Sequence, residues 1–280
     1  MQKLRPPRHK ARPTFEACAK SKNNQTLQLR LLAAAVTIED AERAYLNHGA
    51  DHTFHIIAQS NHMNGNVTID EMASLYDDTL RRAKETRCIY NDIRLSATIC
   101  PLCKLRQVSQ LDHYLAKSKY PEYTVTPANL VPSCSDCNRT KLNQAPTTQE
   151  TQMLHPYFDD IDQGVWLHAD VLQTSPPTLI FSVRPCNTWT AVTHKRVLHH
   201  FDTLHLAKLY SVYAGGELVQ MDFLLRKLAA SRDPNAVRSH LIEQAESRGA
   251  AERNCWQAAM YQALADSEWF CSGGHIQIRP

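Results

Sequence analysis

The spacing of apolar residues predicts helices over most of the first hundred positions. From 26 to 47 apolar residues recur at roughly helical intervals, and the interruption around Thr37 can divide the segment into two helices. A second helical stretch is predicted from 68 to 96. Residues 52–64 between them are polar and rich in histidine, so we expect a loop there, with a candidate strand over the short apolar run at 54–58.

The pattern changes after position 143. Residues 144–152 are polar and contain proline, as a linker does. One strand is predicted at 178–183, where β-branched and apolar residues lie between prolines. Further helices are predicted at 197–213, 218–231, 234–247 and 250–267. The chain is therefore expected to be an α+β protein with mainly helical N- and C-terminal segments.

Charge adds one local feature to this picture. Lys and Arg outnumber Asp and Glu by 31 to 28, and a net charge of +3 neither requires nor excludes a polyanionic partner. Basic residues nevertheless crowd the first thirteen positions beside three prolines: Lys3, Arg5, Arg8, Lys10 and Arg12. Such a segment is typical of an extended arm, which is either a solvated tail or a segment that contacts phosphates.

The sequence argues against a membrane protein and against an ATPase. No apolar core of the signal-peptide type follows the arm, and the best apolar stretch, 27–36, is interrupted by Arg30 and is too short to cross a membrane. We therefore expect a cytoplasmic protein without membrane contact. The G-x-x-x-x-G-K-[ST] segment of P-loop proteins is also missing, so any ATP dependence has to come from another protein.

Two C-x-x-C pairs predict a metal site. Two thiolates at this spacing can occupy adjacent corners of a tetrahedron, and two such pairs complete a closed four-cysteine shell. The chain has nine cysteines, and in a reducing compartment metal ligation is expected before disulfides. We predict a structural Zn2+ held by Cys100, Cys103, Cys134 and Cys137, with two unrelated redox pairs as the alternative.

Residues suited to phosphodiester chemistry stand between and after these pairs. Leu111-Asp112-His113-Tyr114 is followed by Pro127-Ala128-Asn129-Leu130, and the second pair runs directly into Asn138-Arg139-Thr140-Lys141. In this order the window from about 100 to 141 resembles the zinc-bearing branch of the HNH endonucleases. The resemblance implies a zinc-stapled ββα-metal module: two short antiparallel strands and a helix around one divalent cation, embedded here among helical segments.

The chemistry explains why these residue types are needed together. Phosphodiester hydrolysis requires a base that activates water, a cation that holds the phosphate, and donors that neutralise developing charge. His113 is the natural base, because an imidazole accepts a proton from water at neutral pH when a hydrogen bond fixes its other nitrogen. The resemblance implies that Asp112 supplies a carboxylate to the cation and that Asn129 ties down the backbone near His113. It also implies that the 3′ oxygen leaves, which gives 5′-phosphate ends.

Asn138 stands where many HNH enzymes carry histidine. Together with Asp112 it would make an all-oxygen protein shell, and such ligands favour Mg2+ or Mn2+ over Zn2+ or Ni2+. The same window carries basic residues that we predict to contact the nucleic-acid backbone: Lys117, Lys119, Arg139 and Lys141. For Lys117 and Lys119 an ordinary exposed loop is the alternative.

Three further segments have two interpretations each. The segment His155-Pro-Tyr-Phe-Asp-Asp160 could close over the site, but we favour a packed hydrophobic plug. The cluster between His194 and His200 could bind phosphate or metal, but we favour a solvated helix face. A solvated face is also favoured over a phosphate-facing stripe for the basic residues between Arg81 and Arg87.

The predicted organisation is a basic arm at 1–13, a helical region at 14–98, the nuclease module at 99–143, and a C-terminal region at 144–280 for packing or partner binding. At this scale the chain resembles the nuclease subunits of bacterial ATPase–nuclease anti-phage systems, the Septu type among them. That resemblance implies a DNA substrate and a partner ATPase, and a homo-oligomer is expected if the chain alone cuts both strands. The rivals are a sequence-reading restriction or mobile-element HNH nuclease, and a non-catalytic zinc-stapled adaptor that binds nucleic acid or an ATPase.

Overall fold

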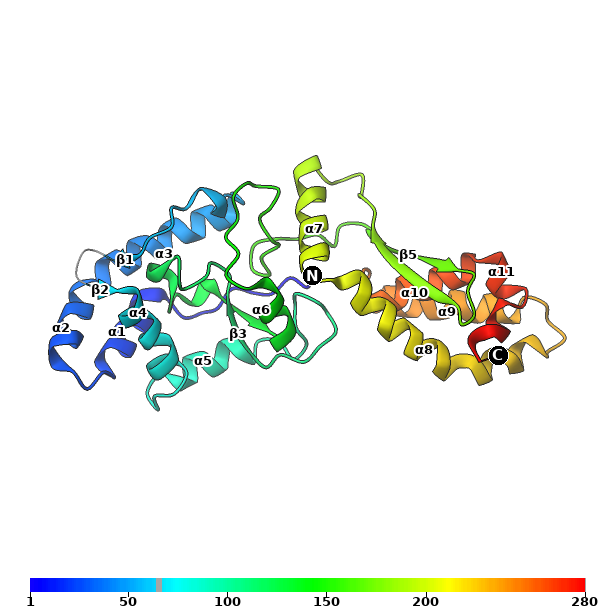
Figure 1. Cartoon of the computed structure of the whole chain (residues 1–280), viewed down its shortest axis with the longest axis horizontal. Helices are drawn as coiled ribbons and strands as arrows, with labels where there is room; N and C mark the ends of the chain where they lie inside the picture. Colours follow the sequence, from blue (N-terminus) through cyan, green and yellow to red (C-terminus); the bar gives the residue numbers. More distant parts are fainter. Residues whose placement is uncertain (64–66, 280) are drawn as a thin grey trace. The chain divides into compact units, whose positions relative to one another are not determined.

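The chain divides into two compact units, Met1–Asp160 and Ile161–Pro280, and the computed structural model describes residues 1–63 and 67–279 (Figure 1). Both units combine helices with short antiparallel strand pairs, as the α+β class requires. No helix of these described residues has both the length and the apolar character needed to cross a membrane.

The division between the units lies after Asp160, whereas the sequence placed the start of the C-terminal region at 144. Residues 144–160 remain in unit 1 because their side chains and carbonyls bond to its centre. The Tyr114 hydroxyl donates to the Met153 carbonyl oxygen at 2.5 Å, and the Tyr157 hydroxyl donates to the Leu130 carbonyl oxygen at 2.7 Å.

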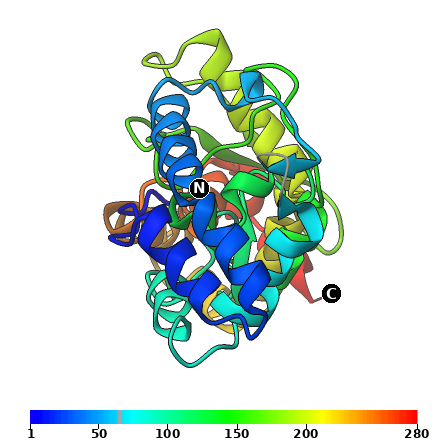
Figure 2. The same cartoon turned by 90° about the vertical axis from the view of Figure 1, so that its left-hand side faces the viewer.

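Three helices open unit 1: α1 (Ala11–Lys20), α2 (Gln25–Ala33) and α3 (Ala35–Ala50). Figure 2 gives a view onto these blue helices. Asn24 caps α2 by accepting a hydrogen bond from the Leu27 N–H at 2.9 Å. The predicted break in the segment 26–47 is confirmed, but it falls at Ala34 rather than near Thr37. The apolar sides of these helices contribute fully buried side chains to the core, among them Phe15, Cys18, Leu31 and Ile38.

The basic N-terminal arm is attached to the rest of unit 1. The Gln2 N–H donates to the Pro101 carbonyl oxygen, and the Leu4 N–H donates to the Pro156 carbonyl oxygen, each at 2.8 Å. Extended backbone runs only to residue 10, since α1 begins at Ala11. The arm is therefore no solvated tail, and three of its basic side chains make surface ion pairs: Lys3 with Asp160, Arg8 with Asp92, and Arg12 with Glu16 and Glu39.

The polar region 52–64 is a loop, as predicted, but its candidate strand is wrong. Phe54–Ile56 form a 3-10 turn (η1) instead, with i→i+3 bonds from the Ile56 and Ile57 N–H groups and with the Phe54 side chain fully buried. A short strand β1 (His62–Met63) pairs with β2 (Val67–Thr68). Asn64, the last position of the predicted loop, lies outside the described residues.

The predicted helix from 68 to 96 is interrupted. It consists of α4 (Ile69–Ser74), a π-helical segment η2 (Leu75–Leu80), a turn, and α5 (Arg87–Arg94). Thr68 and Glu71 form a capping box that starts α4. Threonine hydroxyls interrupt the helical pattern, since Thr79 bonds to the Leu75 carbonyl and Thr86 bonds to the Thr79 carbonyl at 2.7 Å.

The centre of unit 1 is an antiparallel strand pair followed by a helix. Strand β3 (Gln110–His113) pairs with β4 (Leu130–Ser133) in a register that sets Asp112 opposite Val131. Helix α6 (Ser135–Lys141) follows β4 directly. Two 3-10 turns, η3 (Pro121–Tyr123) and η4 (Pro127–Asn129), lie in the connection between the strands.

Unit 2 is a strand pair covered by helices. Strand β5 (Leu167–Leu172) pairs with β6 (Thr178–Val183), and the predicted strand at 178–183 is confirmed while β5 was not predicted. The helices are α7 (Ala191–Thr203), α8 (Leu206–Ala229), α9 (Ala236–Ala251), α10 (Trp256–Asp266) and the short α11 (Glu268–Cys271). A final 3-10 turn, η5, spans Gly274–Ile278.

The first two predicted C-terminal helices, 197–213 and 218–231, have wrong boundaries. The break lies at His205, whose left-handed backbone (φ 51°) separates α7 from α8. Residues 214–217 are instead part of the continuous α8, where Gly215 and Gly216 occupy interior helical positions. The remaining two predicted helices correspond to α9 and α10.

Candidate active site

The two cysteine pairs converge on one point. Cys100 and Cys103 lie in a turn after α5, which is closed by a hydrogen bond from the Cys100 N–H to the Arg106 carbonyl oxygen at 2.8 Å. Cys134 caps α6 and Cys137 lies in its first turn. All four sulfur atoms are buried and lie within 4.8 Å of one another. Four converging thiols fit a tetrahedral Zn2+ and leave no ligand position open, as in a structural site.

A pocket of about 350 Å3 lies beside β3 and α6. Asp112 and His113 reach it from β3, and Asn138 reaches it from α6. The structure thus brings three of the predicted catalytic residues to one cavity. The fourth, Asn129, is fully buried and does not line the cavity.

The ring of His113 is fixed by two contacts. Its Nε2 lies 2.8 Å from the Thr124 carbonyl oxygen, and since a carbonyl can only accept, Nε2 carries the proton and donates. The ring also packs edge-on against Tyr76, with centroids 4.4 Å apart. Burial lowers the pKa of His113 to about 3, so the imidazole is neutral at pH 7 and its Nδ1 is a proton acceptor.

The side chain of Asn129 forms hydrogen bonds to two backbone segments that position His113. Its Oδ1 accepts from the Leu115 N–H at 2.7 Å, and its Nδ2 donates to the carbonyl oxygens of Leu115 and Tyr123 at 3.0 and 3.1 Å. Leu115 lies two residues after His113, and Tyr123 precedes the Thr124 carbonyl that holds the ring. The side chain of Asn129 therefore fixes both the strand that carries the imidazole and the loop that orients it.

Replacing Asn129 with alanine should cost the protein about 3 kcal/mol, because three buried backbone groups lose their partners at once. We expect a clear drop in the thermal midpoint of unit 1, measured by circular dichroism or calorimetry. Asn47→Ala, at an exposed position of α3, is the control and should leave the midpoint nearly unchanged. Equal midpoints for both variants would show that Asn129 is not a structural clamp.

A buried hydrogen-bond chain supports Asn129 from behind. The Tyr157 N–H lies 3.2 Å from His155 Nδ1, which makes Nε2 the protonated nitrogen of that ring. His155 Nε2 then donates to the Tyr45 hydroxyl at 3.1 Å, and this hydroxyl donates to Asn129 Oδ1 at 3.0 Å. The chain links α3 and the segment 155–160 to the turn before β4.

The same segment forms an aromatic cluster around His155. The ring of His155 lies 4.2 Å from that of Tyr114, 4.7 Å from that of Phe158 and 5.6 Å from that of Phe54. His155 itself is fully buried. The interpretation of 155–160 as a packed plug is therefore confirmed, and the segment does not line the pocket.

Lys141 is buried against the carboxylate of the site. Its Nζ lies 3.1 Å from Asp112 Oδ2 and donates to the His113 carbonyl oxygen at 2.6 Å, and the two charged side chains are 4% and 6% exposed. Burial raises the pKa of Asp112, against the opposing effect of the Lys141 ammonium. Lys141 was predicted to reach a phosphate from the surface of α6. The structure instead turns it inward, where its ammonium balances a buried carboxylate.

Lys141→Met should destabilise the protein by about 3 kcal/mol, because it leaves the Asp112 carboxylate buried without its cation. Chemical denaturation followed by fluorescence measures this change. Lys119→Met, at a half-buried lysine in the same unit, should shift the unfolding free energy by no more than about 0.5 kcal/mol. A Lys141→Met protein as stable as the natural one would contradict the buried ion pair.

One side of the pocket is lined by a buried tyrosine and three charged residues, which we call the rim. Tyr76, Asp77 and Arg81 come from the π-helical segment η2 and the turn after it, and Lys117 follows β3. Asp77 lies 2.5 Å from Lys117 and 3.4 Å from Arg81. Burial alone would raise the pKa of Asp77, but the hydrogen bond from Lys117 and the nearby Arg81 outweigh it and hold the pKa below its ordinary value.

The other predicted basic contacts lie apart from the pocket. Arg139 is exposed on α6, and Lys119 is half-buried after the pocket-lining Lys117. In the described residues, the four-cysteine cluster is the only group of three or more His, Cys, Asp and Glu side chains placed to hold a metal, so the histidines from 194 to 200 form no such group. That segment is helical, with Arg196 and His200 on its buried side.

Sequence reasoning missed the contributions of Tyr45, Tyr76 and Asp77. A π-helical segment shifts the helical register, so no regular periodicity assigns Tyr76 and Asp77 to one face. Tyr45 lies 84 residues from Asn129 along the chain, and no motif in its neighbourhood marked it as part of the site. His155 belonged to a segment that the sequence had singled out, although its bond to Tyr45 was not foreseen.

Comparison with known proteins shows similarity to a phage protein. Protein ea31 of Escherichia phage lambda is 34% identical over 226 residues, which cover 75% of this chain and 76% of ea31. No protein-family model matches the sequence. No solved structure matches it either.

Proposed function

The chain belongs to the family of protein ea31 of Escherichia phage lambda, and we propose that it is a metal-dependent endonuclease of the HNH type. The single observation that carries this proposal is the state of His113. Its Nε2 donates to the Thr124 carbonyl oxygen, which leaves Nδ1 as the proton acceptor on a residue that lines the pocket. A histidine held in this way is suited to general-base chemistry.

The proposed reaction is hydrolysis of a DNA phosphodiester. His113 Nδ1 takes a proton from a water molecule, and the water oxygen forms a new bond to phosphorus. The bond from phosphorus to the 3′ oxygen breaks, and this oxygen takes up a proton to become a 3′ hydroxyl. The products are a 5′-phosphate end and a 3′-hydroxyl end, and the base returns its proton to solvent.

Asp112 and Asn138 are the residues that would hold the catalytic cation. A carboxylate and an amide oxygen at one pocket are the donor types that Mg2+ and Mn2+ prefer. When bound, the cation supplies positive charge to the phosphate and the leaving oxygen. In this proposal it shares the Asp112 carboxylate with Lys141, whose ammonium lies on Oδ2.

The rim carries two positively charged side chains that can contact phosphates on either side of the one that is cleaved. Lys117 and Arg81 both line the pocket and both pair with Asp77. A phosphate of a bound polyanion can replace Asp77 as the partner of these two side chains. The proposal for DNA as the substrate, with Mg2+ or Mn2+ and a structural Zn2+, rests on this arrangement together with the resemblance to HNH enzymes.

The test is plasmid cleavage by the zinc-loaded protein with Mg2+, Mn2+, added Zn2+ or a chelator. We expect nicking or linearisation with Mg2+ or Mn2+ and none with chelator. Cleavage with Zn2+ but not with Mg2+ would contradict the role of Asn138. The anti-phage setting and the partner ATPase rest on the whole-chain resemblance, so the same assay is repeated with a candidate ATPase and ATP. Inactivity under all of these conditions would favour a non-catalytic zinc-stapled adaptor.

A further inference from the structure

The turn between η2 and α5 carries a cluster of basic side chains. Residues 81–87, which we call the basic turn, contain four cations and one carboxylate: Arg81, Arg82, Lys84, Arg87 and Glu85. Arg82, Lys84 and Arg87 are exposed, and within residues 1–63 and 67–279 none of the three forms an ion pair with a carboxylate. The basic turn is therefore a positively charged patch that its own chain leaves largely uncompensated.

Backbone hydrogen bonds hold the basic turn in a fixed shape. The Thr79 carbonyl oxygen accepts from the Arg82 N–H at 3.1 Å, from the Ala83 N–H at 2.8 Å and from the Thr86 hydroxyl at 2.7 Å. Thr79 and Thr86 are both buried at the base of the turn. The exposed cations thus project from an ordered backbone, and a ligand that binds them has only side chains to order.

The basic turn begins at the pocket. Arg81 lines the pocket, and its carbonyl oxygen accepts a hydrogen bond from the Arg87 guanidinium. This guanidinium also lies over the ring of Tyr90, 4.8 Å from its centroid. Arg87 therefore braces the turn, while the side chains of Arg82 and Lys84 make no hydrogen bond in the described part of the chain.

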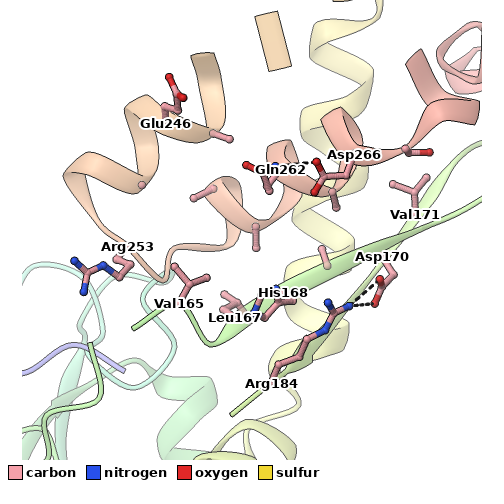
Figure 3. A pocket seen from close by; sticks show the side chains of 17 residues that line it. Val165, Leu167, His168, Asp170, Val171, Arg184, Glu246, Arg253, Gln262 and Asp266 are labelled. Carbon is pink, nitrogen blue, oxygen red and sulfur yellow. Dashed lines mark hydrogen bonds and ion pairs between the residues drawn. The ribbon is translucent and has the colours of Figure 1, made fainter. Parts of the chain in front are cut away.

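The larger pocket of unit 2 shows what a compensated surface looks like. It has a volume of about 760 Å3 and is lined mainly by β5, α9 and α10 (Figure 3). Arg184 donates to the two carboxylate oxygens of Asp170 at 3.0 and 3.1 Å, as Figure 3 shows. Arg253 donates to the Asp162 carbonyl oxygen at 2.7 Å. The arginines of this pocket are thus already bonded, whereas two cations of the basic turn are not.

We propose that the basic turn binds the phosphate backbone of duplex DNA beside the phosphate that is cleaved at His113, a proposal that rests on the endonuclease function above. Arg81 lies at the pocket, and Arg82 and Lys84 extend the contact beyond it. This continuity distinguishes the turn from an ordinary solvated helix face, the interpretation that the sequence favoured. Contacts to phosphates carry no sequence information, so the turn should strengthen binding to DNA of any sequence.

The double variant Arg82→Gln with Lys84→Gln tests this surface. Neither side chain is bonded within the described chain, so the fold should be unaffected. Binding to a fluorescent DNA duplex is measured by anisotropy without added Mg2+ or Mn2+, at salt concentrations from about 50 to about 200 mM. We expect the affinity to fall about tenfold, equally on two duplexes of unrelated sequence. The slope of log K against log salt should decrease in magnitude by about 2, one for each lost phosphate contact.

A second double variant is the matched control for net charge. Lys208→Gln with Lys227→Gln removes the same charge from exposed positions on α8, in unit 2. It should leave the affinity and the salt slope unchanged. Equal losses in the two double variants would show that only net charge matters and would overturn the proposal. An Arg82→Gln, Lys84→Gln protein that binds like the natural one, or a natural protein that does not bind the duplex, would also overturn it.

Cleavage by the same proteins separates this inference from the endonuclease function. With Mg2+ and ensured saturation of the DNA by enzyme, the Arg82→Gln, Lys84→Gln protein should cut at the natural rate, because both side chains lie outside the catalytic group. Affinity that depends on the basic turn without cleavage by any protein would contradict the endonuclease and leave the binding surface standing. Cleavage together with an affinity that is indifferent to the turn would do the reverse.

Discussion

Cys103→Ser should abolish zinc retention and unfold unit 1. The thiol of Cys103 belongs to a buried group of four whose sulfur atoms lie within 4.8 Å of one another, and serine is a poor zinc ligand. Structural zinc contributes on the order of 10 kcal/mol of folding free energy in small zinc domains, which is comparable to the whole stability of a domain. Zinc content by elemental analysis and thermal unfolding by calorimetry measure the two parts of this prediction.

Unit 2 provides an internal reference for that experiment. It contains none of the four cysteines and has its own core, so a folded fragment beginning near residue 161 should survive limited proteolysis. Cys88→Ser is the matched control, because Cys88 is exposed in the same unit and lies outside the cluster. A Cys103→Ser protein that unfolds like the Cys88→Ser protein would refute a structural role for the metal.

His113→Ala should lower the rate of DNA cleavage by about 10²- to 10⁴-fold, the usual contribution of a general base. The imidazole is the group whose second nitrogen is fixed by Thr124 and whose Nδ1 is a proton acceptor at the pocket. Alanine removes this acceptor while the Asn129 clamp and the zinc cluster remain. The rate is measured with enzyme in excess, so that product release does not limit it.

Two comparisons separate loss of the base from loss of the fold. His113→Ala should bind zinc and DNA as the natural protein does, which makes binding without cutting its signature. His62→Ala, at an exposed histidine outside the pocket, should cut at the normal rate. Equal cleavage by His113→Ala and the natural protein would remove His113 from the mechanism.

Local sequence patterns were sufficient for the parts of the site that lie close together along the chain. The two cysteine pairs are joined by a connection that carries Asp112, His113 and Asn129, and the structure brings these residues together around one strand pair and one helix. The α+β class and the strand at 178–183 also followed from residue patterns. In each case the feature depends on a short segment whose residue types and spacing can be read directly from the sequence.

The remaining features depend on contacts that no short window contains. The side chain of Lys141 points into the protein because its ammonium compensates the buried carboxylate of Asp112. Asp112 lies 29 residues earlier in the chain, so no short window of sequence shows this pairing. Strand β5 escaped prediction because Ala169 and Asp170 have low strand propensity, although apolar and polar residues alternate along it. Tyr45 bonds to Asn129 across 84 residues of sequence, and His155 bonds to Tyr45 across 110. Only the tertiary fold brings these pairs together.

In the proposed reaction, a water molecule activated by His113 attacks the phosphorus, and the bond to the 3′ oxygen breaks. The most direct measurement is cleavage of a DNA duplex by the natural protein in ¹⁸O-labelled water, with Mg2+ or Mn2+, followed by mass spectrometry of the products. We expect one ¹⁸O atom in each new 5′-phosphate and an unlabelled 3′ hydroxyl. Absence of cleavage, or products whose new phosphate carries no label or lies on the 3′ end, would contradict the proposed reaction.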